Sequence, residues 1–201
     1  MDLRSLRKIL WSLVGLAAVV GIGLVIWSEY AREPAANSEA PAFRAEFQLT
    51  DHNGAIRTEK DFAGRWMLVF FGFVNCPDVC PTTLSEVAAV MEQLGEDAQA
   101  VQPLFISIDP ERDTPSALAD FVPRFDADII GLTGTAEQVA RTADTFQIYS
   151  EKIDQSDAPD GYTMGHSSQL FLFDPSGGYT AFWPYGTPAE QITADLRERL
   201  L

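Results

Sequence analysis

The sequence predicts an α/β domain that follows an N-terminal transmembrane helix. Apolar runs rich in β-branched and aromatic residues alternate with segments of helical periodicity between residues 66 and 146. This order is typical of parallel strands joined by right-handed crossovers. A separate apolar run without a charged residue covers residues 9–27. We therefore expect a cytoplasmic N-terminus at residues 1–8, an anchor at residues 9–27, a linker at residues 28–42 and one domain at residues 43–201.

The expected anchor depends on the length of the apolar run and on its flanks. Its 19 uncharged residues would make a helix of about 28 Å, which matches the hydrocarbon thickness of a bilayer. Trp11 and Trp27 stand near its ends, as interfacial aromatic residues do. The preceding basic residues, Arg4, Arg7 and Lys8, predict that the N-terminus stays in the cytoplasm. The domain would then lie on the periplasmic side of the inner membrane, attached by a single pass.

A cleaved signal peptide is the alternative for the same region. Ser38-Glu39-Ala40 offers small residues at a suitable spacing. It lies far beyond the apolar run, however, and that run is also long for a signal peptide. An uncleaved anchor is therefore favoured. The polar residues 28–42 contain Pro34 and Pro41 and are typical of a tether.

The net charge excludes one class of partner. The 201 residues carry a formal charge of -15, and because residues 1–8 contribute +2, the rest of the chain carries -17. Such an acidic body repels phosphate groups, so nucleic acid is not an expected partner. A hydrophobic share of 46% is enough for a buried core.

The domain begins with an expected β-hairpin. Its two segments, residues 43–50 and 55–58, are joined through Asn53-Gly54, which can take the positive φ angles of a tight turn. His52 lies in this turn, where turn chemistry sufficiently explains a polar residue and a metal-ligand role is disfavoured. Residues 66–73 then form a short apolar run that predicts a strand buried on both faces.

Helix signals separate the later strands. Pro81 fits the first position of a helix whose apolar stripe is closed by Gly95. Capping patterns predict three further helices, which open at Thr114, Thr135 and Thr187. The first of these would end near Pro123 and the second near Phe146. Further strands are expected at residues 101–108, 129–132, 169–173 and 179–183.

Residues 151–165 lack apolar periodicity and carry several acidic side chains. They predict a long exposed loop, and loops of this length are usually functional or mobile. His166 follows this segment, at the mouth of the strand expected at residues 169–173. Taken alone, such a histidine is more often a hydrogen-bonded loop residue than a ligand.

Both cysteines of the chain, Cys76 and Cys80, come directly after the strand at residues 66–73. Open α/β sheets place their chemistry at this end of a strand. We expect Cys80 at a helix N-terminus, where unpaired N–H groups and the helix dipole favour a thiolate, so the pair should be more acidic than free cysteine. A structural disulfide is the ordinary alternative in an exported domain. A bridge that closes only three intervening residues would stabilise the fold little, so reactivity is favoured.

Three motifs together carry a family resemblance. The segment Gly72 to Pro81 contains CxxxCP, residues 109–115 read Asp-Pro-Glu-Arg-Asp-Thr-Pro, and His166-Ser167 is followed by Asp174-Pro175. In this order they closely resemble the Sco/SenC family, over about residues 43–200. The resemblance implies a thioredoxin-like core in which the two thiols lie opposite the loop that carries His166.

The resemblance also implies a function in copper handling. Sco/SenC proteins are membrane-anchored factors that serve the assembly of cytochrome c oxidase and handle copper for the binuclear centre of its subunit II. The family's metal ligands fall on Cys76, Cys80 and His166. The implied cofactor is a copper ion, and the implied partners are cytochrome c oxidase subunit II and other copper chaperones or thiol reductants. Many relatives have an acidic residue where this chain has Gly165, so the surroundings of the imidazole differ.

Ligand chemistry agrees with copper(I), because two thiolates and an imidazole suit a soft ion in a three-coordinate site. A structural zinc site would need a fourth ligand. The alternative function is that of a thiol–disulfide oxidoreductase, in which Cys76, as the more exposed thiol, attacks and Cys80 resolves. His166 discriminates between the two functions, because exchange needs only the thiols.

Three acidic residues, Asp78, Asp109 and Asp113, are candidates for an outer group that orients a metal or a partner. Asp113 also stands beside Thr114-Pro115, where a helix is expected to begin. A role next to the helix cap is therefore favoured for Asp113.

Overall fold

The computed structural model describes residues 43–200. The anchor expected at residues 9–27 and the linker expected at residues 28–42 lie outside this range and stay predictions. Within the described range, none of the helices has the length and apolar character needed to cross a bilayer.

Strands and helices alternate through the described domain. The strands are β1 (Gln48–Asp51), β2 (Ile56–Thr58), β3 (Trp66–Gly72), β4 (Val101–Ser107), β5 (Ile130–Thr133), β6 (Ser150–Asp154), β7 (Tyr162–His166), β8 (Leu170–Phe173) and β9 (Tyr179–Trp183). The α-helices are α2 (Val79–Leu94), α3 (Pro115–Phe121), α4 (Ala136–Thr145) and α5 (Ala189–Leu200). Short 3-10 helices are η1 (Glu59–Phe62), η2 (Gly95–Ala100), η3 (Val122–Arg124) and η4 (Pro159–Gly161).

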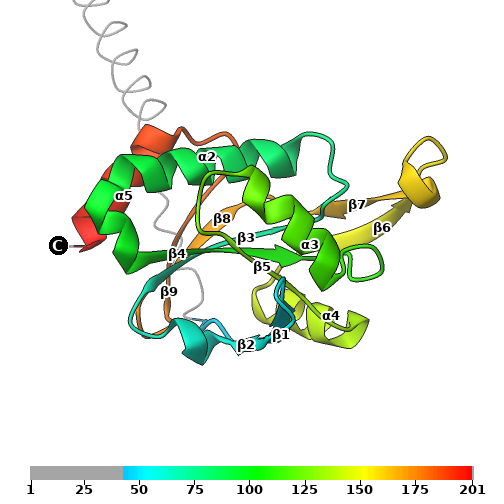
Figure 1. Cartoon of the computed structure of the whole chain (residues 1–201), viewed down its shortest axis with the longest axis horizontal. Coiled ribbons are helices and arrows are strands. Elements are labelled where there is room, and N and C mark those ends of the chain that lie inside the picture. The colour runs from blue at the N-terminus through cyan, green and yellow to red at the C-terminus, as the bar shows by residue number, and fades with distance from the viewer. Residues whose placement is uncertain (1–42, 201) are drawn as a thin grey trace, which may run out of the picture. The chain divides into compact units, whose positions relative to one another are not determined.

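Seven strands form one mixed sheet in the order β2-β1-β5-β4-β3-β8-β9. β3 pairs in parallel with β4, and β4 pairs in parallel with β5, which confirms the pattern expected from strand–helix alternation. The outer neighbours β1, β8 and β9 pair antiparallel. Figure 1 shows α2 and α5 on one face of this sheet and α4 on the other. Such a layered arrangement covers both faces of the central strands.

The core is centred on β3. Leu68, Val69, Phe70 and Phe71 are each at most 1% exposed, which confirms the expected strand with two buried faces. α2 lies on one face and buries a stripe with helical spacing, made of Cys80, Thr83, Leu84, Val87, Val90 and Leu94. The helix ends at Gly95, where φ is +62°, a conformation that glycine adopts without a steric cost.

Two of the three predicted helix caps are confirmed. The third helix, α5, begins at Ala189, and the Thr187 hydroxyl donates to the Pro184 carbonyl at 2.8 Å instead. Thr114 caps α3 by accepting a hydrogen bond from the Ala117 N–H at 3.2 Å, and Thr135 and Gln138 form the capping box of α4. α2 begins at Val79, two residues before Pro81. Cys80 therefore lies inside the first turn of the helix.

The first hairpin is confirmed, in a shorter form. β1 and β2 pair antiparallel, and the turn between them contains Gly54 at a φ of +85°. The carboxylate of Asp51 accepts hydrogen bonds from the backbone of Asn53 and Ala55 at 2.9 Å each. The Nδ1 atom of His52 accepts a hydrogen bond from the Gly131 N–H at 3.1 Å. His52 is therefore a structural residue of the turn.

The prediction of a long exposed loop at residues 151–165 is wrong. β6 and β7 form a two-stranded antiparallel sheet over most of this segment, with Ser150 opposite His166 at one end. Every residue of β6 is exposed. A strand with no buried face shows no alternation of apolar and polar residues, which is why the pattern was absent from the sequence. Figure 1 shows the hairpin projecting beyond the edge of the main body.

Candidate metal centre

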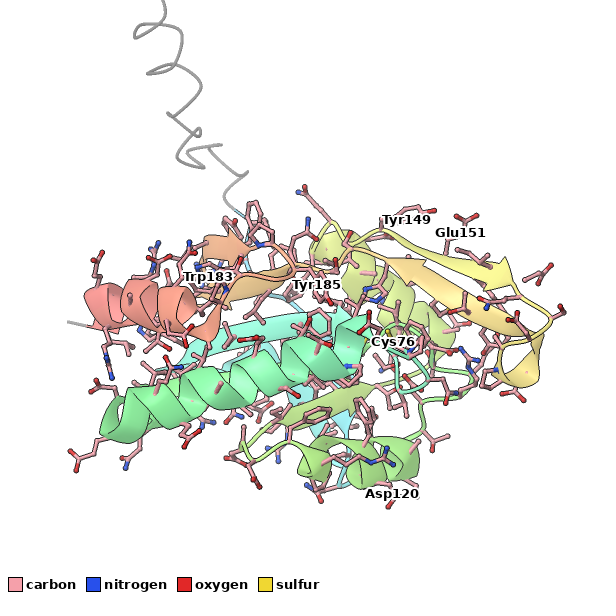
Figure 2. The ribbon with its side chains drawn as sticks, turned by 90° about the horizontal axis from the view of Figure 1, so that it is seen from above. Cys76, Asp120, Tyr149, Glu151, Trp183 and Tyr185 are labelled. Atoms are coloured by element: carbon pink, nitrogen blue, oxygen red, sulfur yellow. The ribbon has the colours of Figure 1, made fainter. Side chains whose placement is uncertain are left out.

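The turn after β3 places the two thiols. The Cys76 N–H donates to the Phe73 carbonyl at 3.2 Å and closes a tight turn directly beyond the strand. The Cys80 N–H, in the first turn of α2, points at the Cys76 sulfur over 3.4 Å. The N-terminus of α2 thus directs one N–H group at the sulfur of Cys76. Figure 2 shows Cys76 just past the N-terminal end of α2.

The two cysteines differ in exposure. Both are free thiols, but Cys80 is fully buried whereas Cys76 is half-buried. Gly72 makes the space for Cys80: a Cβ atom built there would lie 2.6 Å from the Cys80 sulfur and 2.9 Å from the Phe105 ring. The close approach of α2 to the end of β3 therefore requires glycine at this position.

His166 ends β7 and turns its ring toward the thiols. Its Nε2 atom lies 3.8 Å from the Cys80 sulfur, and its Nδ1 atom lies 2.7 Å from the Ser167 carbonyl oxygen. Because a carbonyl oxygen can only accept, Nδ1 is the donor in this hydrogen bond, and Nε2 is the ring nitrogen that faces the sulfurs. The ring also contacts Phe70 and Phe73 edge to face, with centroids 6.2 and 5.9 Å away.

The three side chains form one group of donor atoms. The sulfurs of Cys76 and Cys80 and a ring nitrogen of His166 all lie within 4.8 Å of one another. The structure therefore brings together the three residues that the family resemblance implies as ligands. Two sulfurs and one imidazole nitrogen are soft donors of the kind that copper(I) prefers.

The pKa values of the two thiols are shifted in opposite directions. The hydrogen bond from the Cys80 side chain lowers the pKa of Cys76 to about 4, against the opposing effect of its partial burial, and His166 contributes in the same direction. The same hydrogen bond and burial raise the pKa of Cys80 above that of an ordinary thiol. The sequence-based expectation of two acidic thiols is thus right only for Cys76. Cys80 is the donor that keeps its neighbour ionised.

The acidic residues singled out in the sequence lie around this group and not in it. Asp113 is 1% exposed, and its Oδ2 atom accepts hydrogen bonds from the Val74 N–H at 3.0 Å and the Ser107 hydroxyl at 2.7 Å. The expected capping role is therefore wrong for Asp113, because the Thr114 hydroxyl caps the helix instead. Burial raises the pKa of Asp113 to about 6.

The other two carboxylates also have protein partners. Asp109 binds Arg112 and Tyr162, both of which the sequence-based prediction missed. Arg112 lies inside the Asp-Pro-Glu-Arg-Asp-Thr-Pro motif, which was the available signal. Asp78 is exposed at the start of α2, and its carboxylate accepts from the Thr82 hydroxyl at 3.4 Å.

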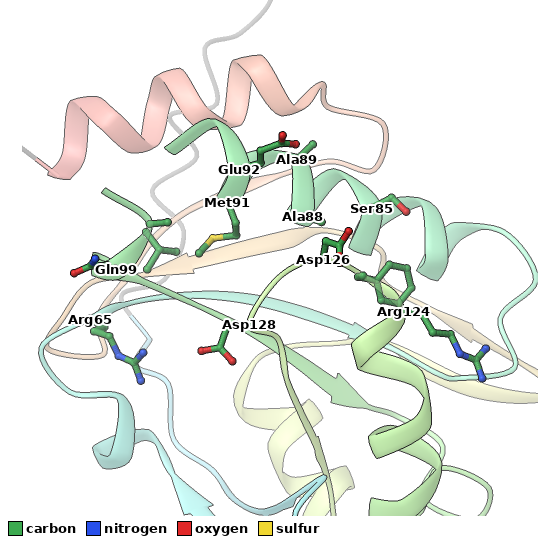
Figure 3. Close-up of a pocket in the computed structure, with 13 residues that line it drawn as sticks. Arg65, Ser85, Ala88, Ala89, Met91, Glu92, Gln99, Arg124, Asp126 and Asp128 are labelled. Carbon is green, nitrogen blue, oxygen red and sulfur yellow. The ribbon is translucent and has the colours of Figure 1, made fainter. Parts of the chain in front are cut away.

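A cavity of about 1020 Å³ lies apart from the Cys-Cys-His group (Figure 3). α2, η2 and the segment after η3 line it, with Met91, Arg124 and Asp128 among its walls. It contains none of the three donor residues. The cavity and the Cys-Cys-His group are therefore separate features.

The fold and the site define a class of protein: a thioredoxin-like domain that presents two cysteines at the start of a helix together with a histidine from a separate hairpin. Comparison with known proteins identifies the family within this class. The SCO1/SenC family matches the sequence over residues 35–201. The chain therefore belongs to the SCO1/SenC family.

Individual relatives agree with this assignment. The chain is 36% identical over 201 residues to the protein SCO2 homolog, mitochondrial, of Bos taurus, a match that covers 96% of this chain and 75% of the relative. The crystal structure of Arabidopsis thaliana ScoI with copper bound has a TM-score of 0.74 and 32% identity, covering 79% of this chain and 98% of the other. The structure of Bradyrhizobium japonicum ScoI with copper bound has a TM-score of 0.72 and 38% identity, covering 80% and 100%.

Proposed function

We propose that this chain binds copper(I) through Cys76, Cys80 and His166 and acts in the assembly of cytochrome c oxidase. It would deliver copper to the binuclear copper centre of subunit II, or prepare the cysteines of that centre. The observation that carries the proposal is the convergence of two sulfurs and one imidazole nitrogen within 4.8 Å. The two ScoI structures that hold copper share the fold of this domain and support it.

The protonation states of the two thiols suit a soft cation. Cys76 is already a thiolate near neutral pH, because its pKa is lowered to about 4. The Nδ1 atom of His166 donates to the Ser167 carbonyl, which leaves Nε2 as the ring nitrogen that faces the thiols. Cys80 keeps its proton until a cation replaces it, so metal binding should release about one proton from the thiol pair. Copper would be bound here as cargo between delivery steps.

We also propose that residues 9–27 anchor the protein in the inner membrane, with the domain on the periplasmic side. The support is the uncharged apolar run and its basic N-terminal flank. Full-length protein should stay with membranes after carbonate washing. A shortened, soluble product would contradict the anchor.

The test of the copper site uses both histidines of the chain. Copper(I) is titrated into the reduced, full-length protein in competition with a chromophoric chelator, and the same is done for His166→Ala and His52→Ala. We expect His166→Ala to bind more weakly and to lose a nitrogen scatterer in X-ray absorption. His52→Ala should bind as the wild type does, because the His52 ring contacts the Gly131 backbone in a distant turn. Identical spectra for wild type and His166→Ala would contradict the assignment.

Thiol–disulfide exchange is the second candidate, and the unequal thiols favour it. Cys76 is accessible and ionised, whereas Cys80 is buried next to it. The Cys76 thiolate would attack a partner disulfide, form a mixed disulfide and release one partner thiolate. Cys80, after losing its proton, would then attack the Cys76 sulfur and release the second partner thiol, so that two electrons pass to the partner. If His166→Ala left copper binding unchanged, this function would rank first.

A further inference from the structure

The hairpin that carries His166 is not part of the main sheet. β6 and β7 pair with each other from Asp154 opposite Tyr162 to Ser150 opposite His166, and they form a separate sheet of two strands. The ladder of the seven-stranded sheet therefore does not fix the angle at which this hairpin leaves the body. Other contacts must fix that angle, and with it the place of the imidazole.

One such contact involves Tyr162, the first residue of β7. Its hydroxyl donates a hydrogen bond to Asp109 Oδ1 at 2.9 Å. Tyr162 is 7% exposed and Asp109 is 3% exposed, so this bond is shielded from water. Asp109 follows β4 by two residues. The bond thus ties the hairpin to the end of a central strand of the main sheet.

Arg112 adds a second and more extensive contact. Its Nε atom donates to Asp109 Oδ2 at 2.5 Å, and its Nη1 atom donates to the carbonyl oxygens of Pro159 at 3.0 Å and Tyr162 at 3.1 Å. The guanidinium also lies 3.7 Å from the centroid of the Tyr162 ring. A single side chain, only 10% exposed, therefore holds the backbone and the first aromatic ring of β7.

The segment that contains Asp109 and Arg112 also contacts the turn that carries the cysteines. Asp113 accepts a hydrogen bond from the N–H of Val74, two residues before Cys76. The loop itself is closed by a hydrogen bond from the Asp113 N–H to the Asp109 carbonyl at 2.9 Å. Residues 109–113, here called the bracket loop, thus contact both the cysteine turn and the histidine hairpin.

We propose that the bracket loop sets the distance between the thiols and the imidazole, with Arg112 as the positioning residue for His166. The inference rests on the proposed function, because it concerns the approach of His166 to copper. Arg112 does not touch the donor atoms. It acts through β7, four residues along the strand from Tyr162 to His166. Without it we expect the thiols to stay in place, while the imidazole keeps only its own contacts with Phe70 and Phe73 and is held less tightly beside them.

The first experiment measures copper(I) binding to two full-length variants. Arg112→Gln removes the charge, the fork of donors and the stacking, and we expect it to weaken binding by roughly tenfold, as loss of an outer-shell contact does. Tyr162→Phe removes only the hydroxyl, and we expect a loss of about threefold. The nitrogen scatterer in X-ray absorption should decrease in both. Arg57→Gln is the matched control. It breaks the ion pair of 2.8 Å between Arg57 and Asp51 in the β1–β2 hairpin and should leave copper binding unchanged.

A double-mutant cycle separates positioning from general damage. In a His166→Ala background, Arg112→Gln should cause no further loss of copper affinity, because the group it positions is already gone. If Arg112→Gln lowered the affinity equally in both backgrounds, the bracket loop would be supporting the thiols and the proposal would be overturned.

Hydrogen exchange of the copper-free protein supplies a readout that does not depend on metal. Amides of residues 150–166 should exchange faster in Arg112→Gln and Tyr162→Phe, while amides of α2 should keep their protection. If Arg112→Gln failed to fold, Tyr162→Phe would still decide the question. A missing nitrogen scatterer in the wild type would refute the proposed function. The wild type could instead show the nitrogen scatterer while Tyr162→Phe and Arg112→Gln keep their copper(I) affinity and their amide hydrogen exchange unchanged. That result would refute only the proposed role of the bracket loop.

Discussion

The turn that carries Cys76 and Cys80 grows out of the most buried strand of the sheet, whereas the hairpin that carries His166 stands at the periphery of the domain. On the thiol side, β3 is buried on both faces and Cys80 packs into the core. On the imidazole side, β6 is exposed along its whole length. The comparison teaches that the candidate metal centre combines two sulfurs attached to the buried core with an imidazole whose position depends on a few side-chain contacts. Substitutions should therefore act very differently on the two sides.

The largest difference should appear between two isomeric aliphatic side chains. Leu84 lies one helical turn after Cys80 and is 1% exposed, while Ile153 lies in β6 and is 45% exposed. We expect Leu84→Ala to lower the free energy of unfolding by about 2–5 kcal/mol, because it leaves a cavity in the core. Ile153→Ala should change it by about 0.5 kcal/mol or less, as exposed positions do. Urea unfolding of both variants measures this, and equal losses would contradict the comparison.

Two glycines allow the same comparison at smaller scale. A Cβ atom at Gly72 would lie 2.6 Å from the Cys80 sulfur, whereas a Cβ atom at Gly165 would lie 3.0 Å from Cδ1, the terminal atom of the Ile153 side chain. We expect Gly72→Ala to cost about 1–3 kcal/mol through overpacking and to displace the thiol. Gly165→Ala should stay within about 0.5 kcal/mol.

The readout for this pair is urea unfolding together with copper(I) affinity. Gly72→Ala should lower both quantities, and Gly165→Ala should leave stability nearly unchanged. Should Gly72→Ala prove neutral in both measurements, the close contact between α2 and the end of β3 would not constrain the site.

The mildest test leaves the fold intact and compares the two thiols. In the reduced, copper-free protein, iodoacetamide should modify Cys76 at a rate that hardly changes between about pH 6 and 8, because its pKa is lowered to about 4 and it is already ionised. Cys80 should stay unmodified in the folded protein, because burial protects it and its pKa is raised. Mass spectrometry locates the label. A rate for Cys76 that rises tenfold per pH unit over this range would contradict a lowered pKa.

The same shift predicts the sign of a pH effect on stability. A thiol whose pKa is lower in the folded state contributes stability that is full above its unfolded pKa of 9.0 and is lost as pH falls toward about 4. The difference in unfolding free energy between wild type and Cys76→Ser should therefore be larger at pH 8 than at pH 5. A difference that shrinks as pH rises would contradict the assignment.

The sequence predicted the central sheet well because its signals are strong there. The apolar runs of β3 and β4 are long and uninterrupted, and Thr114 and Thr135 carry capping patterns that need only local geometry. The hairpin of β6 and β7 was missed because every residue of β6 is exposed and only Tyr162 of β7 is buried, which leaves no periodic pattern in the sequence.

The sequence indicated which three side chains come together in the candidate site, but not the contacts that position them. Motif order placed Cys76, Cys80 and His166 in one family pattern, and the structure brings their donor atoms together. The opposite pKa shifts of the two thiols depend on which sulfur is buried, and that is a tertiary property. The contacts of Arg112 likewise join segments about 50 residues apart, since its Nη1 atom binds the Tyr162 carbonyl. Pairings at such separations have no local sequence signal.

The separation between Cys80 and His166, 86 positions along the chain, has a consequence for the order of events during biogenesis. The two thiols are neighbours as soon as that stretch is made, in any conformation. The imidazole joins them only after a closure of high contact order, which is slow compared with local folding. An unfolded chain can therefore offer a pair of thiols but never the complete set of three donors. Copper held with a nitrogen ligand would therefore mark a chain that has finished folding, whereas copper held by the two thiols alone would not.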